Sequence, residues 1–515
     1  VLLFDTFSIL ITLYVIYIHF FSQEAHQHLT FLYNDNWVKI TLLLTFIREF
    51  SEQNINYKRT VLNPAQLFII SFLGIIFLGT LLLMLPNATY SGISFLNALF
   101  TSTSAVCVTG LIVVDTASYF TFLGQTIILI LIQAGGIGIL TFASYFSYFF
   151  KGVSSFENQL VLSDMTNSEK IGEVFTTLRR ILVITFSIEI VGAILIYSSL
   201  NNELLPAFFD RSFFSIFHSI SAFCNAGFST LSNGLFESGY RYNYFLQSAI
   251  VLLLVLGGLG FPILVNIIKY LNYFITRKVL RLKRWQKQYK PWVLSINSRI
   301  TLITTFSLLF LGTLLFYVSE FNNTLSDHHG IGKFVTALFG AATPRTAGFN
   351  TIDMSTLTFP ALMMTFLYMW IGASPASTGG GIKTSTFAIA TLNFLSIARG
   401  KSRIEIYRRE ISDNSVRRAF AIIALSLIVI GAGIMGILIF DPEKSAVAVA
   451  FECFSAYSTV GLSLGITASL STPSKLILIL IMFIGRVSML SILIAILKKV
   501  KHKNYRYPTE EITIN

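Results

Sequence analysis

Four short segments of this sequence combine small residues with one glycine and a bulky apolar residue after it. The first segment reads Val106-Cys107-Val108-Thr109-Gly110-Leu111 and lies between long apolar stretches. Irregular backbone at membrane depth is tolerated only where it is buried in protein or lines a water-filled cavity. Glycine permits positive φ, so consecutive carbonyl groups can turn toward one axis, and rings of carbonyl oxygens can replace the water shell of a cation. The chemistry indicated is coordination of a dehydrated cation.

Repetition strengthens this interpretation, since a single Thr-Gly pair is common in ordinary turns. Three further segments have the same form: Cys224-Asn225-Ala226-Gly227-Phe228, Arg345-Thr346-Ala347-Gly348-Phe349 and Ser458-Thr459-Val460-Gly461-Leu462. Successive glycines of these segments lie 117, 121 and 113 residues apart. A nearly constant period is the signature of a repeated structural unit, and four such units can surround one axis.

The residues upstream of the four glycines also agree. Six residues before each glycine stand Ser104, Ser221, Ala342 and Ser455, and ten before stand Phe100, Phe217, Leu338 and Phe451. These positions fall in mostly apolar runs of about ten residues, which are shorter than the roughly 20 residues of a membrane-spanning helix. We therefore expect half-membrane pore helices over 95–105, 211–223, 332–342 and 445–456.

Composition indicates a membrane protein. Of 515 residues, 54% are hydrophobic and 12% are charged, and the mean hydropathy is +0.70, which leaves too little polar surface for a soluble protein of this size. The net charge of +12 comes from short basic clusters between apolar spans, without the aromatic-interleaved basic face of a nucleic-acid-binding protein. No nucleic-acid partner is expected. Three cysteines are too few for a disulfide framework, so free thiols are expected.

The order of segments predicts an all-α polytopic membrane protein with four repeats, each a helix, a pore helix and a second helix, around one central pore. The repeats are expected over 61–150, 177–275, 298–398 and 418–500. Their first and second helices are expected over 67–85 and 119–150, 181–200 and 244–274, 300–318 and 359–397, and 419–440 and 476–497. Residues 1–60 are expected to form an extension with one retained transmembrane helix over 2–21 and an interfacial helix over 37–50, and residues 501–515 a cytoplasmic tail.

Basic residues set the expected orientation, because cytoplasmic loops carry an excess of Lys and Arg. They cluster between the repeats and in the tail, around residues 151–180, 277–290, 399–418 and 498–506. The inter-repeat loops and the C-terminus should therefore be cytoplasmic. The opposite loops carry acids such as Glu203, Asp210, Glu320 and Asp327, so the pore segments should enter from outside, where acids attract cations or are simply solvated.

One stretch interrupts the expected second helix of repeat three. It reads Gly372-Ala373-Ser374-Pro375-Ala376-Ser377-Thr378-Gly379-Gly380-Gly381-Ile382-Lys383-Thr384. Proline and three consecutive glycines break a helix, and the break begins 24 residues after Gly348, below the proposed filter. A phosphate-binding loop is rejected because Ile382 separates the glycines from Lys383 and no strand precedes them. A movable gate and a plain helix kink packed against neighbours remain the two interpretations.

Arg486 stands in the apolar run of the last repeat. A charge in a membrane-spanning helix costs on the order of 3 kcal/mol, so Arg486 should face the bundle interior or a water-filled path. The preceding Gly485 follows Gly461 by 24 residues, the same offset as the break in repeat three. A positive charge at that depth would oppose a passing cation. The alternative is an arginine that binds carbonyl groups only for packing.

Together these features resemble the Trk/Ktr/HKT superfamily of potassium transporters over about residues 60–500. The residues that carry the resemblance are the four single-glycine segments, the stretch from Gly372 to Thr384, the Phe483-Ile484-Gly485-Arg486 motif and Leu131-Ile132-Gln133-Ala134-Gly135-Gly136-Ile137-Gly138. Within the superfamily the Ktr-type membrane subunit is the most similar.

The resemblance implies a pseudo-fourfold pore, a homodimer in the lipid bilayer and control by a cytosolic nucleotide-binding ring, so that a nucleotide acts only through that partner. It implies that Arg486 works with an intramembrane gate formed by Ala373, Ser374, Pro375, Ser377, Thr378, Gly379, Gly380, Gly381 and Lys383. Four filter glycines favour potassium, with sodium considered as an activator. Arg345 and Pro344 depart from the pattern of the other segments, and Arg345 is expected to tune or weaken an outer site.

The expected function is passive potassium uptake across the cytoplasmic (inner) membrane. The alternative is a sodium- or proton-coupled symporter, which needs a second ion site; the acids well inside the repeats are Glu189 and Glu452. An enzyme is not expected, because His218 lies in a pore helix without a His/Asp/Glu cluster and is better explained as a core or capping residue.

Overall fold

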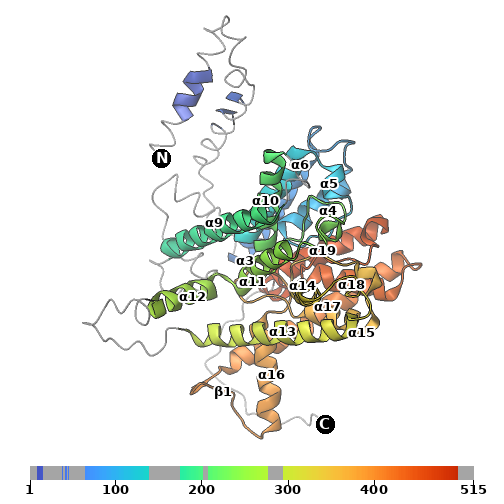
Figure 1. Cartoon of the computed structure of the whole chain (residues 1–515). Helices are drawn as coiled ribbons and strands as arrows, with labels where there is room; N and C mark the ends of the chain where they lie inside the picture. Colours follow the sequence, from blue (N-terminus) through green and yellow to red (C-terminus); the bar gives the residue numbers. More distant parts are fainter. Residues whose placement is uncertain are drawn as a thin grey trace, which may run out of the picture.

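The computed structural model of the chain describes residues 8–15, 37–38, 41–42, 45, 64–138, 174–200, 207–275 and 294–496. Within these ranges the chain is almost entirely helical, and its strands are one short antiparallel pair, β1 (Glu405–Ile406) and β2 (Arg409–Glu410). Figure 1 shows the helices from α3 to α20 grouped in one body, with the helix over residues 8–15 apart from it. The all-α architecture predicted from the sequence is confirmed.

Each of the four predicted repeats begins with a long apolar helix. These first helices are α3 (Pro64–Leu83), α9 (Val174–Ser199), α13 (Ile296–Glu320) and α17 (Asp413–Phe440). Residues 179–199 of α9, all of α13 and all of α17 are long and apolar enough to cross a membrane. Large apolar side chains such as Ile194, Phe310 and Met435 are exposed on them. A bilayer would cover such surfaces, which a soluble monomer rarely exposes in quantity.

A shorter helix follows each first helix at the positions where pore helices are expected. These are α4 (Phe95–Val106), α10 (Phe208–Phe223), α14 (Ile331–Ala342) and α18 (Ala446–Tyr457). At 12 to 16 residues they are shorter than a span. Their C-terminal halves are buried, and Phe100, Phe217 and Phe451 are fully enclosed. The C-terminal end of every pore helix therefore lies in the interior of the bundle.

The second helices of the repeats end earlier than the sequence predicted. They are α6 (Phe122–Ile137), α11 (Tyr244–Leu259), α15 (Phe359–Trp370) and α19 (Thr472–Val487). The single helices predicted over 244–274 and 476–497 are wrong. Gly260 has a φ of 84° and the chain bends there by 106° into α12 (Phe261–Phe274). Ser488 has a φ of 74° between α19 and α20 (Met489–Ile496). Left-handed backbone cannot continue a right-handed helix.

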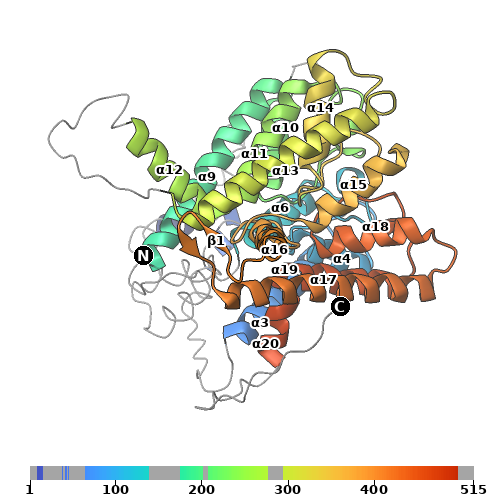
Figure 2. The same ribbon diagram turned by 90° about the horizontal axis from the view of Figure 1, so that it is seen from below.

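The interruption predicted in repeat three is present. Helix α15 ends at Trp370, and α16 (Thr384–Ala398) begins after an irregular loop. In the view of Figure 2, α16 is seen end-on near the middle of the molecule. It packs against α13 and α17. The loop before α16 therefore reaches this helix from the interior of the bundle.

The helices pack in a closed cycle. Each pore helix contacts the first helix of its own repeat: α4 with α3, α10 with α9, α14 with α13 and α18 with α17. Each pore helix also contacts the second helix of the preceding repeat: α10 with α6, α14 with α11, α18 with α15 and α4 with α19. The last of these contacts joins the fourth repeat to the first, so the cycle returns to its start.

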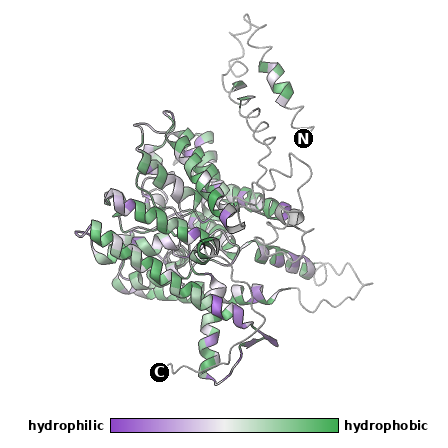
Figure 3. Cartoon of the chain, turned by 180° about the vertical axis from the view of Figure 1, so that it is seen from behind, coloured by the Kyte–Doolittle hydropathy of each residue, from purple (hydrophilic) through white to green (hydrophobic). Residues whose placement is uncertain are grey.

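Several expected elements lie wholly or largely outside the described residues. These are most of the extension 1–60, residues 139–150, the basic segments at 151–173 and 277–290, and the tail 501–515. Within the extension, residues 8–15 are helical. In Figure 3 many residues coloured as hydrophilic lie in and around the hairpin β1–β2, whereas the ribbon of the helical body is largely coloured as hydrophobic. This is the contrast expected between a membrane body and a polar loop.

Candidate ion pathway

The four proposed filter segments leave the buried ends of the pore helices with the same backbone geometry. The residues two positions before the glycines have φ between 49° and 70°: Val108, Asn225, Thr346 and Thr459. The glycines have φ between 70° and 92°: Gly110, Gly227, Gly348 and Gly461. Positive φ is unusual outside glycine and especially costly for β-branched residues. Positive φ recurs at matching positions of all four segments, so the four share one backbone conformation.

The four glycines also form a closed ring. A Cβ atom added to any of them would meet the carbonyl oxygen that precedes the glycine of the next segment: Ala226 for Gly110, Ala347 for Gly227, Val460 for Gly348 and Thr109 for Gly461. The four separations are 2.3, 3.0, 2.3 and 2.3 Å. Side chains cannot fit at such distances, so glycine is needed for this approach of backbones as well as for its φ. The segments follow one another around the ring in chain order.

Hydroxyl groups at the ends of the pore helices hold the segments in place. The Oγ of Ser104 accepts a hydrogen bond from the backbone N of Gly110 at 3.1 Å, and that of Ser455 accepts one from Gly461 at 3.0 Å. In the second segment, Ser221 donates to the carbonyl oxygen of Phe228 at 2.7 Å. Repeat three has Ala342 at this place.

Thr343, one position further along, takes over the anchoring role in repeat three. Its hydroxyl donates to the carbonyl oxygen of Phe349 at 2.5 Å. This is the relation that Ser221 has to Phe228 in repeat two. The sequence predicted no anchoring role for Thr343, because the corresponding residues of the other segments are Ala105, Ala222 and Ala456.

Protein surrounds the three cysteines and Arg345. The three cysteines, Cys107, Cys224 and Cys453, are buried free thiols, as predicted. Arg345 is 8% exposed, and its Nε has no hydrogen-bond partner among the described residues. It lines a cavity of about 10 Å³ together with Thr305, Gly258 and Ala373. None of the four ring glycines lines this cavity. The expected effect of Arg345 on an outer site therefore stays a prediction.

A second, larger cavity borders the ring of four glycines. Its volume is about 430 Å³, and all four ring glycines line it. Two carboxylates, Asp115 and Asp353, also line it, each five residues after the glycine of its segment, and no basic side chain does. We refer to this cavity as the vestibule. The sequence reasoning overlooked these two aspartates, although their equal offsets were visible.

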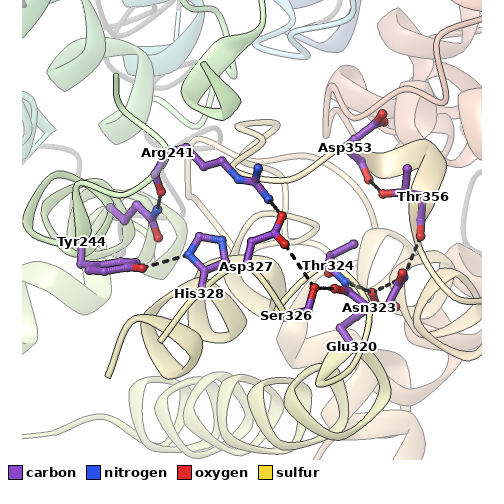
Figure 4. A network of polar contacts seen from close by, with 11 residues as sticks. Arg241, Tyr244, Glu320, Asn323, Thr324, Ser326, Asp327, His328, Asp353 and Thr356 are labelled. Atoms are coloured by element: carbon purple, nitrogen blue, oxygen red, sulfur yellow. Dashed lines mark hydrogen bonds and ion pairs between the residues drawn. The ribbon is translucent and has the colours of Figure 1, made fainter. Parts of the chain in front are cut away.

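A network of polar contacts ties the loops beside the vestibule together between repeats two and three (Figure 4). Arg241 forms an ion pair with Asp327 at 2.8 Å, and Tyr244 Oη lies 3.0 Å from Nδ1 of buried His328. Burial and the nearby Arg241 charge lower the pKa of His328, and the Arg241 hydrogen bond and charge lower that of Asp327.

The same network reaches the vestibule. Glu320 accepts hydrogen bonds from the backbone N of Thr358 at 2.9 Å and from Nδ2 of Asn323 at 2.8 Å. Asn323 also donates to the carbonyl oxygen of Thr356, whose own hydroxyl donates to the carbonyl oxygen of Asp353. The position of one vestibule carboxylate is thus coupled to the outer loop of repeat three.

The loop 371–383 of repeat three lies directly against the left-handed residues of the ring. The backbone N of Gly380 donates to Oγ1 of Thr459 at 2.8 Å. A Cβ added to Gly379 would lie 2.0 Å from Oγ1 of Thr346. Thr378 donates to the carbonyl oxygen of Gly257 at 3.2 Å. The three consecutive glycines therefore let the loop pack closely against two filter segments.

The start and end of this loop are fixed as well. The backbone N of Ser374 donates to the carbonyl oxygen of Gly258 at 2.9 Å, and Phe261 donates to that of Ala376 at 3.2 Å. Lys383 donates from Nζ to the carbonyl oxygen of Gly379 at 2.5 Å, inside the loop itself. Pro375 and Ser377 lie between these attachments. A plain helix kink does not describe this arrangement, because the chain leaves the helix for thirteen residues.

Arg486 joins the loop to the opposite side of the pathway. Its guanidinium donates to the carbonyl oxygen of Thr378 in the loop and to that of Gly135 at the end of α6. Helix α6 belongs to repeat one, α19 to repeat four and the loop to repeat three. The charge thus sits where three repeats meet, as the sequence predicted for a residue facing the bundle interior.

The other candidate groups have structural surroundings. His218 has its Nδ1 2.9 Å from the carbonyl oxygen of Phe214 and its Nε2 2.9 Å from Oγ of Ser229. Among the described residues, no group of three or more His, Cys, Asp or Glu side chains is arranged to hold a metal ion. Backbone carbonyl groups, by contrast, can bind an alkali cation.

The chain can now be compared with known proteins. Residues 35–507 match the sequence model of the TrkH family, described as "Cation transport protein". The Ktr system potassium uptake protein B of Bacillus subtilis is 35% identical over 453 residues, which cover 87% of this chain and 96% of that protein. The potassium/sodium uptake protein NtpJ of Enterococcus hirae is 34% identical over 466 residues, which cover 88% and 98%.

The fold has a solved counterpart in the crystal structure of the potassium transporter TrkH from Vibrio parahaemolyticus. The TM-score is 0.64, with 18% identity and coverage of 96% of this chain and 97% of that one. At this identity the likeness shows the fold alone. The resemblance drawn from the sequence is confirmed by the family match and by relatives that align over nearly their whole length. These relatives are transporters, so the chain is not an enzyme. The chain belongs to the TrkH family of cation transport proteins.

Proposed function

We propose that this protein takes up potassium across the cytoplasmic membrane through a channel-like pore whose selectivity filter is the ring of four glycine segments. The observation that carries the proposal is the closed contact of Gly110, Gly227, Gly348 and Gly461 at the end of one vestibule. Relatives named as potassium uptake proteins support potassium as the cargo. The metal site is the set of filter residues predicted from the sequence.

The filter acts by exchanging water for protein oxygens. Left-handed backbone before each glycine sets the orientation of successive carbonyl groups, and a ring of carbonyl groups can replace the hydration shell of a cation. Transport is passive, driven by a membrane potential worth about 2.3 kcal/mol per charge per 100 mV. The vestibule supplies cations to the ring, because Asp115 and Asp353 give it negative charge without an opposing basic side chain.

The loop 373–383 and Arg486 form the gate below the filter. In the present arrangement the loop packs against Thr346 and Thr459, and Arg486 bridges it to Gly135. The guanidinium places a positive charge beside the path of a cation that leaves the filter. Opening requires the loop to withdraw and the arginine to release its carbonyl partners. A regulator can bias this equilibrium only by binding the open and closed states differently.

The regulator in this proposal is a cytosolic ring of nucleotide-binding subunits beneath a homodimer of this chain. Relatives that carry the name of a Ktr system support such a partnership. The hairpin β1–β2, which contains Arg409, offers a polar surface next to α16, which continues the gate loop. Arg403, just before the hairpin, accepts a hydrogen bond from Ser396 of α16 at its carbonyl oxygen. In this proposal sodium acts as an activator; the name of the potassium/sodium uptake protein NtpJ supports only that a relative takes up sodium.

Flux measurements in liposomes test this function. The purified chain is reconstituted, and potassium and sodium fluxes are compared for the wild type, Gly110→Ser and a variant with residues 373–381 shortened. We expect the wild type to select potassium, Gly110→Ser to admit more sodium and the shortened loop to raise flux. The filter is misassigned if Gly110→Ser leaves the ratio of the two fluxes unchanged. The gate is misassigned if shortening the loop lowers or preserves flux while selectivity is intact.

A further inference from the structure

A buried carboxyl group lies directly behind the second filter segment. Glu189 of α9 is 4% exposed. Its two carboxyl oxygens lie 2.9 and 3.0 Å from Nε2 of Gln133, in α6 of repeat one. The Sγ of Cys224, the residue that opens the second segment, lies 4.0 Å from Oε1 of Glu189 and 3.6 Å from Oε1 of Gln133. The carboxyl group therefore touches the seam between repeats one and two at the filter.

This site has little freedom to rearrange. The carbonyl oxygen of Glu189 accepts a hydrogen bond from Oγ of Ser219 in the pore helix α10 at 2.6 Å. A Cβ added to Gly136 would lie 2.4 Å from Sγ of Cys224. Backbone and side chain of Glu189 are thus both fixed to the elements that carry the filter. A change in its charge is felt at the second segment without a large movement.

No basic group neutralises Glu189 within the described residues. The facing side of α6 contributes Gln133, and α11 has no acid or base after Tyr244 at its outer end. On α10 the titratable residues besides the adjacent Cys224 are Asp210, Arg211 and His218. Arg211 donates to the carbonyl oxygens of Tyr197 and Leu200, and His218 is held by Phe214 and Ser229.

Arg486 is a cation in this region, and it donates to the carbonyl oxygen of Gly135, two residues from Gln133. Its two printed partners are carbonyl oxygens, and no ion pair joins it to Glu189. An amide and a thiol are neutral and cannot cancel a full negative charge. A carboxyl group at membrane depth therefore needs either a bound cation or a proton.

The chemistry of the neighbours favours the proton. A hard metal cation prefers a shell of oxygen ligands, whereas the atoms closest to the carboxyl oxygens of Glu189 are the amide nitrogen of Gln133 and the sulfur of Cys224. Neither the vestibule nor the cavity beside Arg345 is lined by Glu189. A proton requires no such space, because it forms an O–H bond on one carboxyl oxygen.

We propose that Glu189 is a proton-binding site that sets the affinity of the filter for potassium, an inference that rests on the proposed function. A proton from water binds one carboxylate oxygen and converts the anion into the neutral acid; its release to water restores the anion. The anion behind Cys224 attracts potassium in the filter, and the neutral acid does not. The apparent KM for potassium should therefore fall as pH rises, by on the order of tenfold across the transition.

The test measures potassium flux in liposomes over a range of pH for the wild type, Glu189→Gln and Glu452→Gln. Glu452 in α18 is the matched control, since its carboxyl group is also buried. It accepts hydrogen bonds from the hydroxyl groups of Ser463 and Thr467. We expect Glu189→Gln to keep the high KM of the acid form at every pH, and Glu452→Gln to retain the wild-type response. Gln133→Leu removes the amide donor that stabilises the anion, so the transition should move to higher pH.

Infrared difference spectra between high and low pH give a readout that does not need flux. The wild type should show a carbonyl band of a protonated carboxyl group that Glu189→Gln lacks and Glu452→Gln keeps. The proposal is overturned if KM of Glu189→Gln follows pH as in the wild type, or if no carboxyl band depends on Glu189. If the wild type moves no potassium while the band is present and depends on Glu189, the proposed function fails and the proton site stands.

Discussion

Repeat three differs from the other three repeats below the ring of glycines, although the four glycine segments share one backbone geometry. In repeats one, two and four, a glycine near the end of the second helix packs against the carbonyl group at the end of the pore helix: Gly135 on Val106, Gly257 on Phe223 and Gly485 on Tyr457. The corresponding Gly372 packs on Gly380, within the loop of its own repeat. Three repeats thus build a regular support, and the third sends its chain across the pathway. In the proposed function, ion selection and gating would therefore fall to separate parts of one scaffold.

The largest effect should come from a ring glycine. Gly110→Ala would place a Cβ 2.3 Å from the carbonyl oxygen of Ala226 at a φ of 88°. Clash and backbone strain of about 3 kcal/mol or more should lower selective potassium flux on the order of a hundredfold. Gly258→Ala is the control, because its Cβ would approach nothing nearer than 3.5 Å.

The same experiment compares the repeats. Gly348→Ala should be as damaging as Gly110→Ala, since its Cβ would lie 2.3 Å from the carbonyl oxygen of Val460. Retained selectivity in Gly348→Ala alone would mean that repeat three is exceptional within the ring as well as below it.

Arg486→Gln should produce the next largest change. It removes two charge-assisted hydrogen bonds that hold the repeat-three loop to α6, each worth about 1.5–3 kcal/mol. We expect potassium flux of the purified chain to rise about tenfold, with the ratio of potassium to sodium unchanged. Lys475→Gln, a loss of charge near the start of the same helix, should leave flux as it is. A fall in flux, or a loss of selectivity, would contradict the separation of gate and filter.

The anchors of the filter segments provide a finer comparison. Thr343→Val in repeat three and Ser455→Ala in repeat four each remove one hydroxyl hydrogen bond, and each should lower stability by about 1 kcal/mol. Thermal unfolding in detergent measures this change. Adding Ala342→Ser to Thr343→Val places a hydroxyl at the position used in the other repeats, and should restore part of the loss. No loss in Thr343→Val would show that segment three is held by other contacts.

The smallest effect concerns the outer loop of repeat three and pH. Burial and the Arg241 charge lower the pKa of His328 in the folded protein. Its neutral form is therefore favoured by folding, and the stability it contributes is present above the unfolded pKa of about 6.5 and is lost as pH falls through the lower folded value. Hydrogen exchange of residues 321–330, taken relative to the intrinsic exchange rate at each pH, should accelerate below about pH 6. His328→Phe should remove this acceleration, and an unchanged pH profile would exclude His328 as its source.

Glycine spacing allowed the ring to be predicted, because both the φ values and the close approach of the backbones can be met only by glycine at those four positions. The repeat-three loop was visible for a similar reason, as proline and consecutive glycines exclude a helix. The breaks at Gly260 and Ser488 were not predicted, because an apolar run reads as one span whatever the φ of a residue inside it. Hydropathy indicates which residues lie in lipid, but it carries no information on where the backbone changes direction.

Contacts between distant positions were the least accessible. Gln133, Glu189 and Cys224 come from three helices and share no period, so their meeting behind the second segment could not be derived from spacing. Arg345 was noticed in the sequence as a departure from the other segments. That it lines a cavity together with Thr305 follows only from how α11 and α13 pack. The repeat boundaries and the cytoplasmic side of the loops stay predictions.

The closed cycle of helix contacts is made within a single covalent chain, and this has a genetic consequence. Each quarter of the ring is encoded by its own stretch of sequence, so one quarter can gain a proline, an arginine and a thirteen-residue detour while the others keep their form. In an assembly of four identical subunits any such change would occur four times, and four loops would compete for one axis. Because the four quarters are encoded separately within one chain, a single repeat can differ from the other three.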